Sequence, residues 1–571
     1  MSPGLIVPLV IPTTPENRQV SVFMAQYLPD HPGSREPVEA ALGDPRHPRE
    51  HDKMRHMSAK HRLATAALIA CLLPAGAARA AGVPLADAAE RGDVAAVRAL
   101  IAQKSDVNTT RIDGTTALHA AVHADRPDIA DLLIKAGANA AVKDRYGVTP
   151  LYLAAVNGSA EMIVRLLDAG VDANTLDPGG ETALMTAART GATAAMSLLL
   201  ARGAAVDARE PEFQQTALMI AVRENHGPAV NLLIKAGASV NVQTRKGPTP
   251  AFVSPCKGTG CGSEGVGINR GGLPDRGRRA EVKGGMTPLL YAARDGHVEA
   301  ARLLVAAGAD REMADGNGIR PLLMAALNGQ IAVARLLVEA GANVNAGDFW
   351  GRSPLWAAVE YRNLDMNNND QDAPTDNGVD RAPFLDLIRL LIDRGANVNA
   401  RTRDVPPPRR WLYSLNDVSW VDFTGQTPFL RAAFSGDTTT MKLLVERGAD
   451  PNLSTLAGTT PLMAAAGVGW VVAQTYTESV QARIDAVALC LELGADVNAA
   501  NSMGLTALLG AANRGSNDII ELLVTRGARL DIKDKEGRTP LRWAEGVFLA
   551  AVGAERKPAT IALLQKLGTR P

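Results

Sequence analysis

The sequence predicts an all-α fold, a solenoid of about twelve helix-turn-helix repeats with projecting turns and three loop insertions. A unit of about 33 residues returns along the chain, and a fixed period of this length is typical of solenoids rather than of compact catalytic domains. Within each unit, two short helical patterns are followed by a turn that ends in glycine. The glycines that mark the period are Gly114, Gly147, Gly180, Gly285, Gly318, Gly351, Gly425, Gly458, Gly504 and Gly537.

The first helix of each unit begins at a Thr-Pro pair, as at Thr287 and Pro288. The threonine hydroxyl can cap free backbone amides, and proline suits the first helical position because its missing N–H is not needed there. A leucine and a pair of alanines follow at helical spacing and form a thin apolar face. Glycine, as at Gly296, is expected to end the helix in the left-handed conformation.

The second helix carries a Leu-Leu pair, as at Leu303 and Leu304, and stops at a Gly-Ala pair. The segment that follows, with the pattern N-A-x-D-x-x-G, predicts an extended turn that points away from the helices. One unit cannot bury its own apolar stripe, so each unit must stack on both neighbours. Only 4% of the residues are aromatic, and we therefore expect a core built mainly from leucine and alanine.

The repeated motif resembles the ankyrin repeat, most clearly in the segment 287–297 followed by Leu303, Leu304 and the triplet 308–310. The resemblance covers about residues 83–571. It implies a non-catalytic interaction scaffold without a cofactor, whose concave face and turns hold a protein partner. The fold alone does not identify that partner.

The repeats are expected in two blocks, with five repeats in residues 81–247 and seven in residues 286–571. A Gly- and Arg-rich loop, residues 248–285, separates the two blocks. Further insertions are predicted near residues 364–383, 401–424 and 468–484.

Residues 57–80 are typical of a secretory signal. A basic start at 60–62 precedes an apolar core at 63–73, and Ala78-Arg79-Ala80 supplies a small-x-small cleavage site. We expect translation to begin at Met57, which would make residues 1–56 either a segment upstream of the true start or a disordered extension. The protein is then expected in the periplasm or outside the cell.

An alternative interpretation concerns the segment 68–71, which resembles a lipobox and would anchor the protein to a membrane through a lipid on Cys71. The apolar run before Cys71 is short and continues beyond it, so soluble export is the favoured interpretation. After signal cleavage we expect a monomer that is not inserted in the membrane. The chain balances 60 basic against 60 acidic residues, which gives it no general attraction to nucleic acid.

Aromatic residues gather between residues 349 and 423, around the second and largest interruption of the repeat. Trp, Tyr and Arg dominate the hot spots of protein interfaces. Phe349 and Trp350 fall on a turn, where packing explains them less well, whereas the loop aromatics could equally fold back over their own loop. The predicted partner-binding residues are Tyr146, Phe349, Trp350, Arg352, Arg410, Trp411, Tyr413, Trp420 and Phe423.

Few residues suggest chemistry. His119 and His123 share a helix face, but no third metal ligand is near them, and His119 occupies a motif position where a structural hydrogen bond is usual. The acidic run 365–376 resembles a calcium loop, although Asp370 replaces the required glycine, so a solvated loop is favoured. The G-x-G-x-x-G match at 260–265 follows no strand. A metal-dependent enzyme is therefore the weaker alternative, and a secreted effector that binds host proteins is another.

Three cysteines follow the signal. Cys490 lies on the Leu-Leu face of a second helix, where a buried thiol is expected. Cys256 and Cys261 share the Gly-rich loop and could close a small disulfide ring in an oxidising compartment.

Overall fold

The computed structural model describes residues 83–248, 282–363, 381–404, 421–469, 479–547 and 555–569. The chain divides into two units, Met1–Ala78 and Arg79–Pro571, and every described residue belongs to the second unit. Several features predicted from the sequence lie outside the described residues. They are the signal-like segment, the acidic run, Cys71, Cys256, Cys261, Arg410, Trp411, Tyr413 and Trp420. The predictions for them, including the insertion boundaries, stay predictions.

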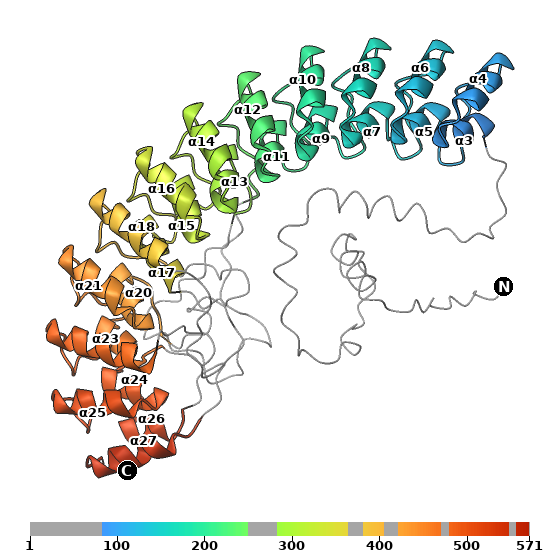
Figure 1. The fold of residues 1–571 in the computed structure, drawn as a ribbon. Helices are drawn as coiled ribbons and strands as arrows, with labels where there is room; N and C mark the ends of the chain where they lie inside the picture. Colours follow the sequence, from blue (N-terminus) through green and yellow to red (C-terminus); the bar gives the residue numbers. More distant parts are fainter. Residues whose placement is uncertain are drawn as a thin grey trace, which may run out of the picture. The chain divides into compact units, whose positions relative to one another are not determined.

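The described residues form antiparallel helix pairs that stack in chain order (Figure 1). The pairs are α3 (Pro84–Glu90) with α4 (Val94–Ala102), α5 (Ala117–His123) with α6 (Pro127–Lys135), α7 (Pro150–Asn157) with α8 (Ala160–Asp168), α9 (Ala183–Thr190) with α10 (Thr193–Ala201), α11 (Ala217–Arg223) with α12 (Gly227–Lys235), α13 (Pro288–Asp295) with α14 (Val298–Ala306), α15 (Pro321–Leu327) with α16 (Ile331–Glu339), α17 (Pro354–Arg362) with α18 (Ala382–Asp393), α20 (Pro428–Ser435) with α21 (Thr438–Glu446), α22 (Pro461–Ala466) with α23 (Val480–Glu492), α24 (Ala507–Arg514) with α25 (Asn517–Thr525), and α26 (Pro540–Ala544) with α27 (Pro558–Lys566).

This arrangement confirms the predicted all-α repeat solenoid for the described part of the chain. Its β-type pairings there are two isolated bridges, Leu176 with Thr182 and Lys246 with Gly284. No helix in the described ranges is long and apolar enough to cross a membrane.

Local sequence explains where the first helix of a pair begins and ends. In α7, Thr149 has an extended backbone and its hydroxyl accepts a hydrogen bond from the Tyr152 amide at 3.2 Å. Pro150 occupies the first turn, and Gly158 ends the helix with a φ of +66°. Both features agree with the roles predicted for the Thr-Pro pair and the closing glycine.

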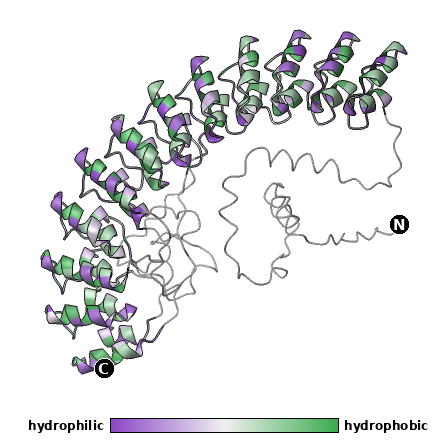
Figure 2. Ribbon diagram, in the orientation of Figure 1, coloured by the Kyte–Doolittle hydropathy of each residue, from purple (hydrophilic) through white to green (hydrophobic). Residues whose placement is uncertain are grey.

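The core runs along the stack between first and second helices. Leu133 on α6 and Leu166 on α8 are fully buried, as are the paired alanines Ala154 and Ala155 on α7. Figure 2 shows hydrophobic and hydrophilic residues alternating within the helix pairs, as expected for helices that each bury one stripe. Cys490 on α23 is also fully buried, which confirms the predicted buried thiol, and burial raises the pKa of this thiol to about 12.

The turns between pairs are joined to one another by main-chain hydrogen bonds. The Arg145 amide donates to the Asp113 carbonyl at 2.9 Å, so the tip of one turn is tied to the tip of the turn before it. The same bond recurs from Phe349 to Asn317 at 3.2 Å. The turns that are joined in this way form an ordered edge rather than a set of independent loops.

Asparagines tie the outer ends of the pairs together. The Asn108 side chain donates to the Gly137 carbonyl at 3.2 Å and accepts from the Asn139 amide at 2.8 Å. Asn241 makes the same two contacts with Gly308 and Asp310, although Gly308 lies 67 residues further along the chain. Equivalent asparagines are Asn174, Asn345, Asn399 and Asn498.

The junction between the pair α17/α18 and the pair α20/α21 buries charge. The Arg362 Nε atom donates to Asp437 Oδ2 at 2.8 Å, and the Asn363 side chain reaches the same oxygen at 3.1 Å. The buried Arg431 forms a second ion pair with the partly buried Glu360. Burial alone would raise the pKa of Asp437, but the Arg362 guanidinium and the Thr440 hydroxyl bring the pKa below its usual value.

Candidate functional site

Large apolar side chains are exposed almost solely on the turns of the described residues. Six of the seven such side chains lie on turns between helix pairs, and the seventh, Val480, starts α23. The six are Ile112, Tyr146, Leu176, Phe213, Phe349 and Leu456. An exposed apolar row on an ordered edge is the kind of surface that protein interfaces use.

Tyr146 lies at the tip of the turn before α7, and 64% of it is exposed. The Arg145 guanidinium lies 5.4 Å from the centre of its ring, and Arg145 Nη2 donates to the tyrosine hydroxyl at 3.3 Å. The cation and the hydrogen bond both hold the ring in place, so Tyr146 presents an ordered aromatic surface. The structure thus leaves this predicted residue accessible to a partner.

Phe349 and Trp350 are neighbours with opposite environments. Phe349 is 42% exposed, whereas Trp350 is only 1% exposed. The amides of Arg403 and Asp404 donate to the Trp350 carbonyl at 2.7 and 3.3 Å, so the segment after α18 lies directly against this turn. The expectation that packing explains Trp350 poorly was therefore wrong.

Arg352 and Phe423 also have packing roles. The Arg352 Nε atom donates to the buried Asp348 carboxylate at 2.6 Å, and its guanidinium lies 5.2 Å from the Trp350 ring centre. Phe423 packs edge to face against Phe434, with ring centres 5.0 Å apart. Both residues are buried. Neither side chain offers a partner the surface that the sequence analysis expected of it.

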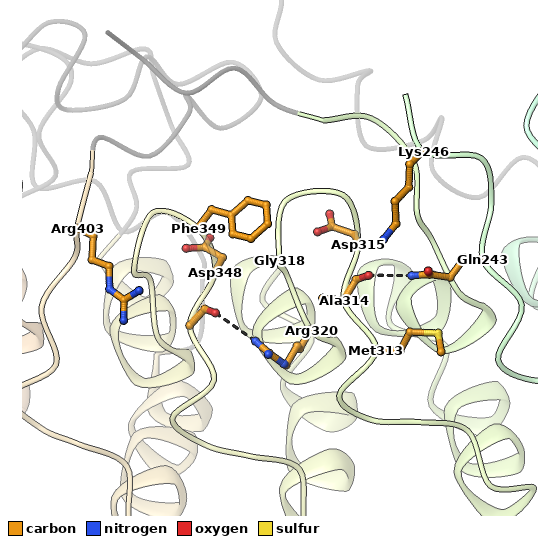
Figure 3. A pocket seen from close by; sticks show the side chains of 11 residues that line it. Gln243, Lys246, Met313, Ala314, Asp315, Gly318, Arg320, Asp348, Phe349 and Arg403 are labelled. Carbon is orange, nitrogen blue, oxygen red and sulfur yellow. Dashed lines mark hydrogen bonds between the residues drawn. The ribbon is translucent and has the colours of Figure 1, made fainter. Parts of the chain in front are cut away.

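A cleft of about 600 Å3 opens among the turns near Phe349 (Figure 3). The Gln243 side chain fixes one wall, since its Nε2 atom donates to the carbonyls of Ala314 at 2.8 Å and Gly285 at 2.9 Å. The lining residues are Gln243, Lys246, Met313, Ala314, Asp315, Gly318, Arg320, Gly347, Asp348, Phe349 and Arg403.

Three cations line this cleft. Lys246 and Arg403 lie on opposite sides, with Arg320 between them (Figure 3). Arg320 donates to the Gly347 carbonyl at 3.3 Å and lies 3.4 Å from a Glu312 carboxylate oxygen. Within the described ranges, neither Lys246 nor Arg403 has a carboxylate within salt-bridge distance, and both are exposed.

The two acidic residues of the cleft are engaged inside their own turns. Asp315 Oδ1 accepts from the amides of Asn317 and Ile319, both at 2.8 Å. Burial raises the pKa of Asp315, and the charge of Asp348 acts in the same direction. Asp348 is itself paired with Arg352. The negative charges are thus largely satisfied, while two of the positive charges face the solvent.

A second cleft of about 440 Å3 adjoins the first and shares Gly347, Asp348 and Arg403 with it. Arg401 adds a further cation, and its Nη2 atom donates to the Ser454 carbonyl at 2.6 Å. The two clefts together make one groove that crosses successive turns.

Lys246, Arg320 and Arg403 were not among the predicted binding residues. A signal existed for Arg320, because it stands where most repeats carry the capping threonine, and α15 begins without a side-chain cap. Lys246 and Arg403 had no signal of their own. They come together because turns that are distant in sequence stack side by side.

His119 has a structural role, as predicted. Its Nε2 atom bonds the Val148 carbonyl at 3.1 Å, and its Nδ1 atom accepts from the Thr116 amide at 3.2 Å. Both ring nitrogens are used, and burial lowers the pKa of His119, which favours the neutral ring. Among the residues that the structure describes, no group of three potential ligands could hold a metal ion.

The geometry defines a helical-repeat solenoid with an apolar and cationic turn surface. Models of ankyrin repeats match this chain, in three-copy form at residues 85–177, 157–244, 272–348, 289–368 and 477–547, and in single form at 350–403 and 424–456. These matches cover more than half of the sequence, so the chain belongs to the ankyrin-repeat family.

Two solved structures are similar to parts of the chain. The human ASB11 ankyrin repeat domain is 27% identical, and the match covers 46% of this chain and 99% of that domain, with a TM-score of 0.35. The ankyrin repeat domain of Bcl-3, described as a unique member of the IkappaB protein family, is also 27% identical. That match covers 45% of this chain and 99% of the domain, again with a TM-score of 0.35. No curated protein was found to match the sequence.

Proposed function

We propose that this protein is a non-catalytic scaffold that binds a protein partner through its turns. Ankyrin repeats indicate a protein–protein interaction scaffold, and proteins of this family are typically non-catalytic. The observation that carries the proposal is the gathering of exposed apolar side chains on the turns, with Tyr146, Phe213 and Phe349 as the aromatic members.

The ordered turn edge supports this function energetically. Several turn tips, including those of Tyr146 and Phe349, are tied to the preceding turn by a main-chain hydrogen bond, so docking there would freeze few backbone torsions. A surface that is already ordered loses less entropy on binding than a flexible loop. Tyrosine and phenylalanine add large contact area with few rotatable bonds.

Export is a separate proposal that rests on the signal-like segment 57–80. The favoured setting is the periplasm, where the partner would be a resident protein. An effector that meets host proteins after secretion is the alternative. Both settings use the same turn surface, so the compartment does not change the proposed site.

A metal-dependent enzyme is the weaker alternative. The pair His119 and His123 gives it no support, because both ring nitrogens of His119 are hydrogen-bonded within the fold. Its remaining element, the acidic run 365–376, lies outside the described residues.

The test begins with the full chain immobilised as bait in a periplasmic extract, followed by identification of captured proteins by mass spectrometry. The dissociation constant of the captured protein is then measured for the wild type and for the double variant Tyr146→Ala/Phe349→Ala. We expect binding to weaken by about tenfold or more, because hot-spot aromatics contribute at least this much.

Val480→Ala provides the matched control, since Val480 is an exposed apolar residue away from the turns. This variant should bind as the wild type does. Equal affinity of all three proteins for the partner would contradict the proposed surface. The buried Trp350 is unsuitable for this test, because its truncation would disturb the fold.

A further inference from the structure

The groove beside Phe349 is lined by four cations and two carboxylates. The whole chain balances 60 basic against 60 acidic residues, so a local excess of positive charge is a property of the site itself. Lys246, Arg320 and Arg403 surround the first cleft, and Arg401 extends the series into the second.

We propose that this groove binds an acidic segment of the protein partner, with carboxylates at Lys246 and Arg403 and an apolar side chain against Phe349. The inference rests on the proposed scaffold function and names the chemistry of the partner at one part of the turn surface.

The two exposed cations of the groove are available to a ligand, whereas its carboxylates are already engaged. Lys246 and Arg403 are exposed and make no salt bridge within the described ranges. Asp315 is held by two backbone amides, and Asp348 by Arg352. An incoming carboxylate would therefore meet two cations that pair with no carboxylate of the described ranges, rather than displace ion pairs seen there. Displacement would cancel much of the gain.

The shape of the groove suits an extended peptide. A cleft of about 600 Å3 continues into one of about 440 Å3 through the shared Gly347, Asp348 and Arg403. This groove passes over successive turns, which suits an extended peptide better than a compact small molecule. Several side chains of such a peptide fit volumes of this size.

The hydrogen-bond donors of the groove suit a carboxylate ligand. The guanidinium of Arg403 offers a planar fork that matches the two oxygens of a carboxylate, and Lys246 supplies a mobile point charge. Phe349, 42% exposed at the same rim, supplies an apolar contact between them (Figure 3). Alternating acidic and apolar side chains in the partner would satisfy both features of the groove.

The test uses the full chain and a fluorescein-labelled decapeptide in which Asp and Glu alternate with leucine. A matched peptide with Asn and Gln in place of Asp and Glu is the neutral probe. Fluorescence anisotropy should show binding of the acidic peptide, weaker binding at high salt, and no binding of the neutral peptide.

The double variant Lys246→Gln/Arg403→Gln should weaken binding of the acidic peptide by about tenfold or more, since hydrogen bonds to charged groups contribute this much. The control variant Lys143→Gln/Lys535→Gln removes two exposed cations from other turns and should bind normally. Circular dichroism should show the same helix content for all variants.

Three results would overturn the inference: no binding of the acidic peptide, equal loss in the control variant, or equal competition by single-stranded DNA of the same charge. The scaffold function can survive this failure. If a captured partner binds through Tyr146 and Phe349 but the acidic peptide does not compete with it, only the acidic groove is refuted. If neither partner nor peptide binds, both proposals fail.

Discussion

The regular stack from α5 to α12 and the junction between α17/α18 and α20/α21 bury different kinds of side chain between their helices. In α7 and α8 the buried residues of the helices are apolar, such as Leu151, Ala154 and Leu166. At the junction the helices bury Arg362, Arg431 and Asp437 as well.

The difference lies at one equivalent position, the residue before the second helix. In the regular stack Ser159 caps α8 by accepting from the Met162 amide at 3.4 Å. At the junction Asp437 caps α21 by accepting from the Thr440 amide at 3.1 Å, and it also binds Arg362 from the preceding pair. At the junction, the cap of α21 is therefore also a link between repeats. It lies next to the pair α17/α18, whose two helices are separated by more residues than those of any other described pair.

The largest effect is expected from removing this link. The variant Asp437→Ala should destabilise the α17–α21 region by about 3–5 kcal/mol, because it leaves the Arg362 charge buried without its partner. Hydrogen exchange resolved by peptide, read by mass spectrometry, would measure the loss region by region.

Ser159→Ala is the matched control in the regular stack, because it removes only a cap. Its expected cost is about 1 kcal/mol, confined to α7 and α8. Similar losses for the two variants would show that Asp437 acts as a cap alone and would remove the distinction between the regions.

Lowering the pH should reproduce part of the destabilisation expected for Asp437→Ala. The pKa of Asp437 is lowered in the fold, so its contribution to stability is fully present above the ordinary value of 3.8 and is lost as the pH falls through the folded value. The loss should be smaller than in Asp437→Ala, because a protonated carboxyl still accepts hydrogen bonds. Unfolding in urea at a series of pH values would measure it.

Asp315 in the cleft should behave in the opposite way. Its pKa is raised, so protonation favours the fold, and its turn should gain stability as the pH falls through the folded value toward 3.8. Exchange at the turn before α15, corrected for intrinsic rates, should show this gain at a higher pH than the loss at Asp437. A loss at both places over the same pH range would contradict the assignment.

A smaller effect tests whether the backbone differs between the regions. Gly170 in the regular stack and Gly395 beside the junction have φ values of +88° and +85°, and a methyl group at either would meet nothing within 4 Å. Gly170→Ala and Gly395→Ala should therefore each cost about 1–2 kcal/mol, the price of the left-handed conformation. Urea midpoints that differ clearly between the two would place part of the difference in the backbone.

The smallest effect is expected from converting the junction to the chemistry of the regular stack. The double variant Arg362→Leu/Asp437→Ser removes both charges and keeps a capping hydroxyl. Replacing a buried ion pair by apolar side chains is often close to neutral, so stability should return to within about 1 kcal/mol of the wild type. A loss as large as that of Asp437→Ala would mean that the remaining network needs the pair.

The sequence predicted the fold well because its signals are local. The capping threonines, the closing glycines and the paired leucines act within a single unit, and the structure confirms them at Thr149, Gly158 and Leu166. Whether a turn side chain is buried or exposed depends on residues outside its own unit. Residues 403–404 hydrogen-bond the Trp350 carbonyl from a later segment, and no local pattern separates the buried Trp350 from the exposed Phe349.

The candidate site was predicted only in part for the same reason. The sequence predicted a binding site at the aromatic residues near residue 349. The cations that give the groove its positive charge come from three separate turns. Their meeting depends on which turns stack together, and the segments between them vary in length. Such a site is a property of the assembled stack rather than of any unit.

The asparagine ties have a consequence for how such a chain can change over generations. Asn108 reaches Gly137 and Asn241 reaches Gly308 by the same bond, although very different lengths of chain lie between the partners. The bond depends on which unit comes next and not on how many residues lead to it. Duplication or loss of a whole unit would therefore preserve this bond at the seam, and new sequence between units can be gained without breaking it.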